Sequence, residues 1–268
     1  MSGSGGLSAL RTFALALALW LIPLRMDSLH AEPADTPSVK VILIGDSTVT
    51  NASGWGGAFC RKHVAAWVQC LNFAKGGTSS RSYGERGYWE PVMGNIRQTG
   101  QGVTTYVLIQ FGHNDLLGRG GRQTDPETEF PSNMRAYAED VISAGAHVIL
   151  VTPLVMREFR HYQVLNRLRP WADADIRVGE ALHIPVLNLN ADSLNAIQEM
   201  GPLKAIYLAK VPPPPEAVEA AQNGDSLRQR IRPFDYIHIG KEGADYFAGM
   251  VASELVKAVP ASADWVRN

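Results

Sequence analysis

The chain has 268 residues, of which 46% are apolar and 19% charged, with 25 lysines and arginines against 26 aspartates and glutamates. The apolar share is ordinary for a globular protein and excludes an intrinsically disordered chain, while two cysteines are too few for a disulfide-built scaffold. A net charge of −1 does not supply the basic surface that nucleic-acid binding needs, so we expect no nucleic-acid partner.

The first residues have the pattern of a secretory signal peptide. Arg11 precedes an apolar run over residues 12–24, and a polar stretch follows that ends in the small residue Ala31. The run is shorter than the roughly 20 apolar residues that span a bilayer. We therefore expect a signal peptide over residues 1–31, a single domain over residues 32–268, and a secreted or periplasmic protein with no membrane contact after cleavage. An uncleaved N-terminal anchor is the alternative.

Five short apolar runs predict the strands of one parallel sheet. The runs cover residues 39–44, 69–73, 105–111, 147–152 and 185–189. Apolar residues at helical spacing predict helices over residues 130–144, 171–182, 191–200 and 243–256. Near-continuous apolar strands that alternate with amphipathic helices indicate an α/β fold, with helices on both faces of the sheet.

Two features of the chain leave alternatives open. Residues 212–215 are four prolines, and residues 216–230 are polar and charged, so we interpret this stretch as a surface excursion with room for one helix. Cys60 is expected on a helix and Cys70 on the strand that follows it. The export prediction permits a disulfide between them, but two buried thiols fit the sequence as well.

Polar residues follow three successive predicted strands. They are Asp46 and Ser47 after the first strand, residues 76–81 after the second, and residues 112–115 after the third. Ligands of open parallel sheets bind beyond the carboxyl ends of the strands. We therefore expect these segments to converge on one crevice.

These segments and a late Asp-x-x-His motif contain the parts of an acyl-transfer site. Ser47 needs a base to become a nucleophile, and His238, oriented by Asp235 three residues before it, can accept the proton. Backbone N–H groups and a side-chain amide can stabilise the oxyanion that then forms. The candidate donors are the backbone of Ser47, the backbone of Gly77 and the amide of Asn114.

Four blocks of the sequence carry a family resemblance. They are Ile-Gly-Asp-Ser-Thr at residues 44–48, Gly-Thr-Ser-Ser-Arg-Ser-Tyr at 77–83, Gln-Phe-Gly-His-Asn-Asp at 110–115 and Asp-Tyr-Ile-His at 235–238. In this order they resemble the SGNH (GDSL-like) hydrolase superfamily, and within it most closely the rhamnogalacturonan acetylesterase family. The resemblance covers residues 39–256. Ile237 departs from it, since the family often has threonine there, and residues 200–233 match no part of the family pattern.

The resemblance implies a three-layer α/β/α, flavodoxin-like fold with strand order 2-1-3-4-5. It implies a catalytic triad of Ser47, His238 and Asp235, with no metal and no cofactor. The implied activity is a serine carboxylic-ester hydrolase that removes acetyl groups from an acetylated pectic polysaccharide, and we expect it to act as a monomer. Acetylated xylan, sialic acid and short acyl lipids remain alternative substrates. An acyltransferase or a non-catalytic carbohydrate-binding protein remains an alternative function.

Three further residues are candidate substrate contacts. Arg81 follows the glycine turn and either anchors it or binds substrate, while Arg157 and His161 follow the fourth strand and can reach the crevice. Arginine suits an anionic uronate because its guanidinium pairs with a carboxylate. A structural anchor for Arg81 and solvated loop positions for Arg157 and His161 are the alternatives.

Four other residues near the crevice are interpreted as structural. We expect His113 to hold the oxyanion loop and Asp46 to bond local backbone N–H groups in its turn. Trp55 and Trp89 lie near glycine-rich turns. We interpret them as core residues, with sugar stacking as the alternative.

Overall fold

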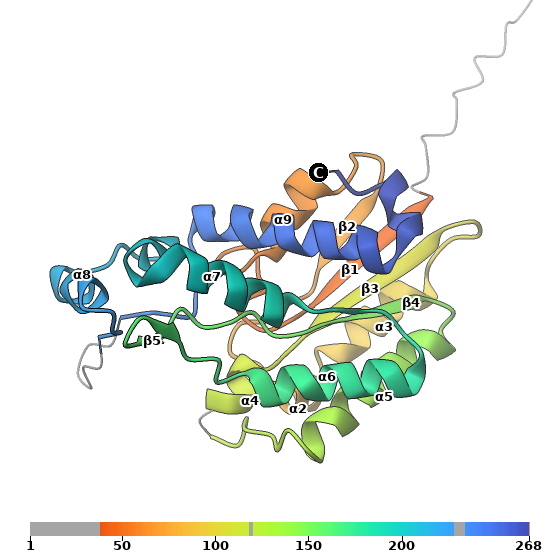
Figure 1. The fold of residues 1–268 in the computed structure, drawn as a ribbon. Coiled ribbons are helices and arrows are strands. Elements are labelled where there is room, and N and C mark those ends of the chain that lie inside the picture. Colours follow the sequence, from red (N-terminus) through yellow and green to blue (C-terminus); the bar gives the residue numbers. More distant parts are fainter. Residues whose placement is uncertain (1–37, 118–119, 228–233, 268) are drawn as a thin grey trace, which may run out of the picture. The chain divides into compact units, whose positions relative to one another are not determined.

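The computed structural model describes residues 38–117, 120–227 and 234–267. The expected signal peptide over residues 1–31 lies outside the described residues, so cleavage and export stay predictions. One parallel sheet of five strands runs through the described chain in the order β2-β1-β3-β4-β7 (Figure 1). These strands are β1 (Val39–Gly45), β2 (Gln69–Asn72), β3 (Thr104–Gln110), β4 (His147–Val151) and β7 (Val186–Leu187).

This strand order confirms the predicted order 2-1-3-4-5, because β7 is the fifth strand of the sheet. The first four strands agree with the predicted bounds to within one residue. The fifth is shorter than predicted, since the chain enters helix α7 at Leu189. All seven residues of β1 are buried, as expected for a strand that is covered on both faces.

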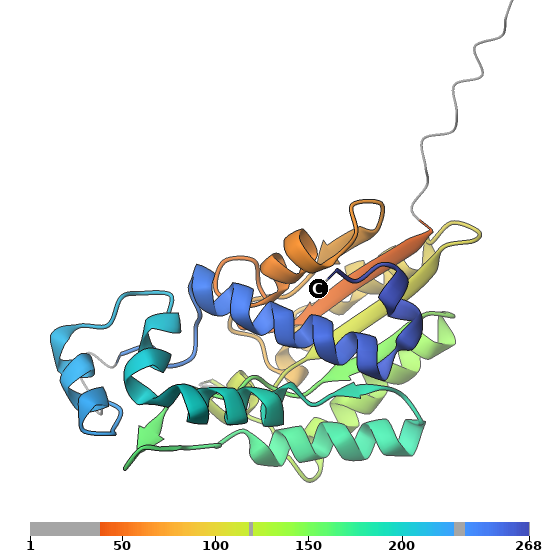
Figure 2. The same ribbon diagram turned by 45° about the horizontal axis from the view of Figure 1, so that its top comes forward.

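Helices cover both faces of the sheet (Figures 1 and 2). One layer contains α1 (Gly56–Ala58), the π-helical turn η1 (Phe59–His63), α7 (Leu189–Ala205) and α9 (Lys241–Ala258). The other contains α2 (Ser80–Glu85), α3 (Trp89–Arg97), α5 (Glu129–Ser143) and α6 (Arg169–Leu182). Alternate residues of β1 fill the two layers, with Val41 and Leu43 in the first core and Ile42 and Ile44 in the second. Each such buried side chain contributes about 2 kcal/mol to folding.

All four predicted helices are present, as α5, α6, α7 and α9. The predicted helix 191–200 is longer in the structure, because α7 continues through a kink at Gly201 and Pro202 to Ala205. Sequence analysis missed α3, although its buried residues Trp89, Val92, Met93 and Ile96 have helical spacing. No helix in the described part of the chain is long and apolar enough to cross a membrane.

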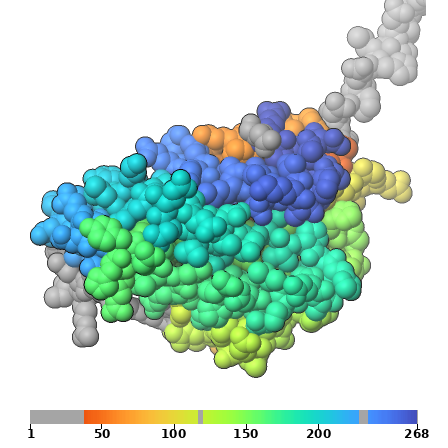
Figure 3. Space-filling view, viewed as in Figure 1, coloured from red at the N-terminus to blue at the C-terminus, as the bar shows by residue number. Residues whose placement is uncertain are grey.

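The polar excursion after α7 contains the one helix that was expected there. Helix α8 (Pro215–Gln222) begins at the last of the four prolines, a position where the missing N–H of proline does no harm. The short hairpin of β5 (Phe159–Arg160) and β6 (Gln163–Val164) was not predicted. In the space-filling view the hairpin lies against α7 and α8 at one end of the visible face (Figure 3). The remaining short elements are α4 (His113–Leu117) and the 3-10 turns η2 (Ile206–Leu208) and η3 (Pro260–Asp264).

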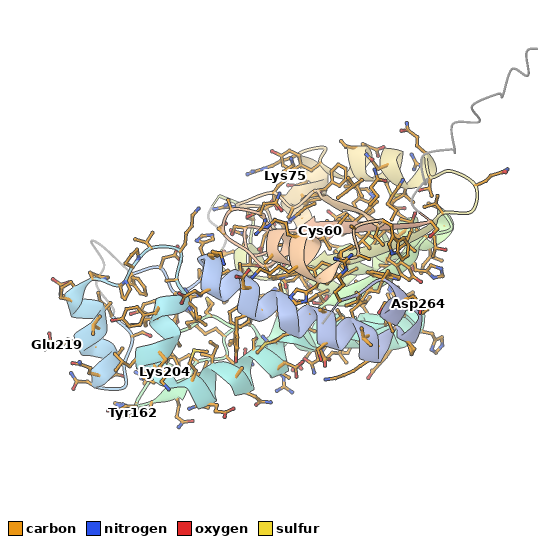
Figure 4. The ribbon with its side chains drawn as sticks, turned by 90° about the horizontal axis from the view of Figure 1, so that it is seen from above. Cys60, Lys75, Tyr162, Lys204, Glu219 and Asp264 are labelled. Carbon is orange, nitrogen blue, oxygen red and sulfur yellow. A yellow bond between two sulfur atoms is a disulfide. The ribbon has the colours of Figure 1, made fainter. Side chains whose placement is uncertain are left out.

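Cys60 and Cys70 form a disulfide, which decides between the two alternatives left open by the sequence. Cys60 lies on η1 and Cys70 on β2, as predicted, with their Cα atoms 5.6 Å apart (Figure 4). Strand β2 is the edge strand of the sheet. The disulfide therefore links the segment between β1 and β2 to a strand that pairs with a neighbour on one side only.

Loss of the disulfide should destabilise the protein. Closing a loop of this length in the unfolded chain corresponds to about 3 kcal/mol of stabilisation. We expect the Cys60→Ser/Cys70→Ser variant to show a free energy of unfolding lower by about that amount, measured by chemical denaturation. Reductant should lower the stability of the wild type equally and leave the double variant unchanged. Two free thiols in the unreduced wild type would contradict the bond.

Candidate active site

Ser47, His238 and Asp235 form a connected hydrogen-bonded triad. Nε2 of His238 lies 2.7 Å from Oγ of Ser47, and Nδ1 of His238 lies 2.8 Å from Oδ2 of Asp235. Ser47 follows β1, whereas the other two lie 188 and 191 positions later, just before α9. The predicted meeting of these residues is confirmed. Their arrangement is that of a serine held by a base which is itself oriented by an acid.

The loop that carries the acid and the base is held by its own hydrogen bonds. Oδ1 of Asp235 accepts the backbone N–H groups of Ile237 at 3.0 Å and His238 at 2.9 Å, so one carboxylate fixes both the turn and the imidazole. The N–H of Lys210 donates to the carbonyl of His238 at 3.1 Å, and that of Ile239 donates to the carbonyl of Ser53 at 3.1 Å. The second bond joins the loop directly to the segment that carries the nucleophile.

Arg157 is not a substrate contact, contrary to the sequence-based prediction. It is fully buried, and its guanidinium donates to the backbone carbonyls of Asp235 at 3.1 Å, Ile237 at 3.3 Å and His238 at 3.0 Å. Its own N–H donates to the carbonyl of Tyr236 at 3.0 Å. Arg157 therefore clamps the backbone beneath the catalytic pair. Burial lowers the pKa of Arg157 to about 10, so the side chain remains a cation at neutral pH.

A buried polar chain positions the segment of Ser47. Oδ1 of Asp46 accepts both the N–H of Thr48 at 2.8 Å and its hydroxyl at 2.7 Å, as its predicted role in the turn requires. The hydroxyl of Thr48 accepts from the Gln110 amide at 2.7 Å, and Oε1 of Gln110 accepts from the Trp55 indole at 3.0 Å. Trp55 is fully buried, which supports its interpretation as a core residue. This positioning role of Gln110 was not predicted from the sequence. Its signal is a polar residue that ends an otherwise apolar strand.

His113 is a buried neighbour of Asp46. Its Nδ1 lies 3.6 Å from Oδ2 of Asp46, which is longer than a hydrogen bond, and both side chains are almost fully enclosed. Although burial raises the pKa of Asp46, the opposed effects of His113 and Thr48 bring it below its ordinary value. Both side chains are thus buried, and Asp46 is not a second acid exposed in the crevice.

The glycine turn after β2 lies against Ser47. A Cβ on Gly76 would be 3.8 Å from Cβ of Ser47, so the turn passes at van der Waals distance from the nucleophile. Gly77 has a φ of 74°, in the left-handed region that favours glycine. The amide of Asn114 donates to the carbonyl of Thr78 at 2.9 Å. The three candidate oxyanion donors therefore belong to segments that meet beside Ser47.

Arg122 supports this turn from the loop between α4 and α5, a role that was not predicted from the sequence. Its Nη1 donates to the carbonyl of Gly77 at 2.7 Å and would lie 3.2 Å from a Cβ on that glycine. The guanidinium therefore fixes the Gly77 peptide, and it would have to shift slightly to make room for a larger residue there. The signal was weak, since Arg122 lies in a polar loop far from the motif it supports.

Asp115 anchors the start of α2, which follows the Gly77 turn. It accepts the N–H of Ser80 at 3.1 Å and the hydroxyls of Ser80 at 2.6 Å and Thr124 at 2.7 Å. Ser79 caps α2 by accepting from the N–H of Ser82. Burial raises the pKa of Asp115 to about 6 despite these bonds. The Thr-Ser-Ser-Arg-Ser block thus folds as a helix start that is anchored on the third strand's loop.

Of the other candidate residues, Arg81 and Trp89 make structural contacts, and His161 is an exposed turn residue, as in the solvated-loop alternative. Arg81 forms a two-pronged ion pair with Glu129 at the start of α5 and donates to the carbonyl of Gly121 at 2.8 Å. This fits the anchoring alternative for Arg81. His161 lies in the turn between β5 and β6, and its N–H donates to Asp225 at 3.0 Å. Trp89 is 8% exposed and donates to Asp140 at 2.8 Å, so it belongs to the core.

The electrostatics of the triad favour proton acceptance by His238. Burial alone would raise the pKa of Asp235, but hydrogen bonds from His238 and Ile237 lower it to about 2. The same Asp235 bond raises the pKa of His238 above its ordinary value, against the opposing effect of burial. Asp235 is therefore anionic across the neutral range and stabilises the imidazolium. Among the described residues, no cluster of histidine, cysteine and carboxylate side chains has the arrangement of a metal site.

Comparison with known proteins identifies the family. Rhamnogalacturonan acetylesterase RhgT of Bacillus subtilis (strain 168) is 32% identical over 172 residues, which are 61% of this chain and 70% of that protein. The chain belongs to the rhamnogalacturonan acetylesterase family of SGNH hydrolases. A second member, the probable rhamnogalacturonan acetylesterase YesY of the same organism, is 26% identical over 222 residues, or 80% of this chain and 91% of that protein. A scan against models of protein families finds no match.

A solved structure shares the fold of this chain. The Bacillus subtilis protein YXIM_BACsu superposes on 81% of this chain with a TM-score of 0.60 and 25% identity. The superposed part is 56% of that protein. The shared part therefore covers most of the described domain.

Loss of the Arg157 hydrogen bonds should lower the free energy of unfolding of the protein. The Arg157→Met variant removes the guanidinium donor from three backbone carbonyls, of which that of His238 keeps the N–H of Lys210, and we expect its free energy of unfolding to fall by about 3 kcal/mol. Arg157→Lys should recover only part of this, because an ammonium cannot span the three acceptors. Arg160→Met removes an exposed arginine from the same loop and serves as the control. Equal stabilities of the Arg157→Met and Arg160→Met variants in urea denaturation would disprove the clamp.

Proposed function

We propose that the protein is a serine esterase that removes O-acetyl groups from a pectic polysaccharide of the rhamnogalacturonan type. The observation that carries this proposal is the Ser47–His238–Asp235 relay, with its bonds of 2.7 and 2.8 Å, beside the Gly77 turn. Membership of the rhamnogalacturonan acetylesterase family supports the substrate class.

The mechanism follows from the positions of the three side chains. His238 takes the proton of Ser47 through Nε2 while the serine Oγ attacks the acetyl carbonyl. The tetrahedral oxyanion is stabilised by the backbone N–H groups of Ser47 and Gly77 and by the amide of Asn114. His238 then gives its proton to the departing sugar hydroxyl, which leaves an acetyl group on Ser47.

Water completes the reaction by the same route. His238 removes a proton from the water, the water oxygen attacks the acetyl carbonyl, and the proton passes to Oγ of Ser47 as acetate leaves. Asp235 keeps its negative charge throughout and stabilises the imidazolium in both halves. The clamp of Arg157 and the Asp235 turn hold His238 in place, so no part of this loop has to move for proton transfer.

Replacement of the nucleophile is the direct test of the proposal. Ser47→Ala should lower acetate release from acetylated rhamnogalacturonan by about 10⁴-fold or more, because no hydroxyl remains to attack. Ser132→Ala, an exposed serine on α5, should retain the wild-type rate. The assay is enzymatic detection of free acetate, with the melting temperature as the check on folding. Full activity in the Ser47→Ala variant would end the proposal.

The pH profile tests the role of His238. The base works only when neutral, so kcat/KM should rise with pH through the pKa of His238, which the Asp235 bond holds above 6.5. In Asp235→Asn this support is lost, so the acid limb should move to lower pH while the plateau rate falls by about 10⁴-fold. Measurement of kcat/KM for 4-nitrophenyl acetate between pH 4 and 9 (roughly the range that histidine can report) decides this. An acid limb that stays in place in Asp235→Asn would show that another group titrates.

A further inference from the structure

The turn between β5 and β6 contains an exposed aromatic side chain on an unusual backbone. His161 and Tyr162 have φ values of 49° and 63°, so two successive residues with side chains lie in the left-handed region. Two-residue hairpin turns of this kind are normally made by asparagine and glycine. A bulky residue at positive φ is an outlier that the surrounding structure has to hold in place, and such outliers gather at binding and catalytic sites.

Three hydrogen bonds hold Tyr162. Its N–H donates to the carbonyl of Gly224 at 2.8 Å, and its carbonyl accepts from the Gln198 amide of α7 at 2.9 Å. Its hydroxyl donates to the carbonyl of Gln222, at the end of α8, at 2.8 Å. Both the backbone and the far end of the ring are therefore fixed, and the ring cannot turn away without breaking the hydroxyl bond.

One side of the Tyr162 ring is covered and the rest is exposed. A Cβ on Gly224 would lie 2.5 to 2.7 Å from three carbon atoms of the ring, so the ring lies over this glycine. Gly224 has a φ of 80°, which also favours glycine. Tyr162 is nevertheless 54% exposed. The structure thus presents a rigid aromatic surface to solvent.

The ring forms one wall of a cavity of about 310 Å³ between the kink of α7 and the end of α8. Leu203, Lys204 and Gln222 line the same cavity. Tyr162 and Lys204 lie close together at the same end of the view in Figure 4. Lys210, six positions after Lys204, donates its N–H to the carbonyl of His238, so a short segment joins this cavity to the triad loop.

We propose that Tyr162 is a stacking platform for one pyranose ring of an acidic polysaccharide, at a subsite separate from the reaction centre. The negative face of an aromatic ring attracts the polarised C–H groups of a sugar ring, and the apolar body of tyrosine suits a half-wet site. Lys204 supplies the charge for a uronate carboxylate, and the amide of Gln222 suits hydroxyl groups. A pre-formed ring loses little conformational freedom on binding.

This subsite rests on the proposed function, because it explains how a polymer substrate is retained. The reaction centre holds one acetyl ester, whereas a polysaccharide extends well beyond it. A second contact on the same chain makes rebinding intramolecular and raises the apparent affinity for polymer without changing the chemistry. The subsite should therefore affect polymeric substrates and leave small esters unaffected.

The test compares matched tyrosine variants of the full chain. Tyr162→Asn removes the ring and keeps a residue that tolerates positive φ, whereas Tyr162→Phe keeps the ring. Tyr246→Asn, at a 40% exposed tyrosine of α9 outside the cavity, is the control. Binding is measured in the inactive Ser47→Ala background by affinity electrophoresis through acetylated rhamnogalacturonan, and through neutral galactan. In the active background, KM for that polymer and kcat/KM for 4-nitrophenyl acetate are measured.

We expect Tyr162→Asn to weaken polymer binding and to raise the polymer KM about tenfold, with kcat/KM for the small ester unchanged. Tyr162→Phe should bind nearly as the wild type does, and Lys204→Gln should weaken binding of the acidic polymer but not of galactan. Equal affinities of Tyr162→Asn and Tyr246→Asn, or no polymer binding in the Ser47→Ala background, would overturn the platform. If Tyr162→Asn fails to fold, unchanged acidic-polymer affinity in Lys204→Gln overturns it instead.

The same experiment separates this inference from the proposed function. A wild type that releases no acetate from any polymer, yet loses polymer binding in Tyr162→Asn, refutes the esterase function and retains the platform. A wild type that deacetylates the polymer, with no effect of Tyr162→Asn on KM or binding, retains the esterase function and refutes the platform.

Discussion

The geometry of the Ser47–His238–Asp235 triad depends on a buried cation, the guanidinium of Arg157. The guanidinium of Arg157 donates to three backbone carbonyls of the segment that carries Asp235 and His238. A charged donor in a dry interior forms strong bonds, but it is costly to bury unless its acceptors are in place. The loop and the arginine therefore require each other, and His238 is held at 2.7 Å from Ser47 as a result.

The nucleophile is held by a second buried network with a different chemistry. Trp55, Gln110, Thr48 and Asp46 form a chain of neutral and charged hydrogen bonds that runs from the core to the turn of Ser47. Each member satisfies a polar group that would otherwise be buried without a partner. His238 and Ser47 are thus positioned by two separate hydrogen-bond networks. The bond from the N–H of Ile239 to the carbonyl of Ser53 joins the segments that carry them. These hydrogen bonds hold both segments in place without a bound ligand, and such preorganisation favours electrostatic stabilisation of an oxyanion.

The fold and the reacting residues were accessible from local patterns. Four of the five strands were predicted to within one residue because parallel strands buried on both faces are continuous apolar runs with clear ends. The convergence of Ser47 with the segments of Gly77 and Asn114 followed from the rule that the carboxyl ends of such strands share one edge. The pairing of Ser47 with His238 was inferred from the chemistry of the Asp-x-x-His motif and was implied by the family resemblance. The fifth strand was overestimated, because the residues after Leu187 are equally good at starting a helix. Helix α3 was missed although its apolar spacing was visible in the sequence.

The amino-acid sequence by itself indicated the strands, the motifs and the chemistry that those motifs can perform, and the family resemblance implied the sheet order. The tertiary structure decided the roles of the arginines and the pairing of the cysteines. Arg157 was expected either to contact substrate or to lie in a solvated loop, and it is instead buried beneath the segment of Asp235 and His238. Arg122 was not predicted, and it donates to the carbonyl of Gly77. A long side chain can reach in any direction from its Cα atom, so its partner depends on which segments pack around it. Local pattern records that arginine is present, and only packing determines whether it faces solvent, substrate or a buried carbonyl.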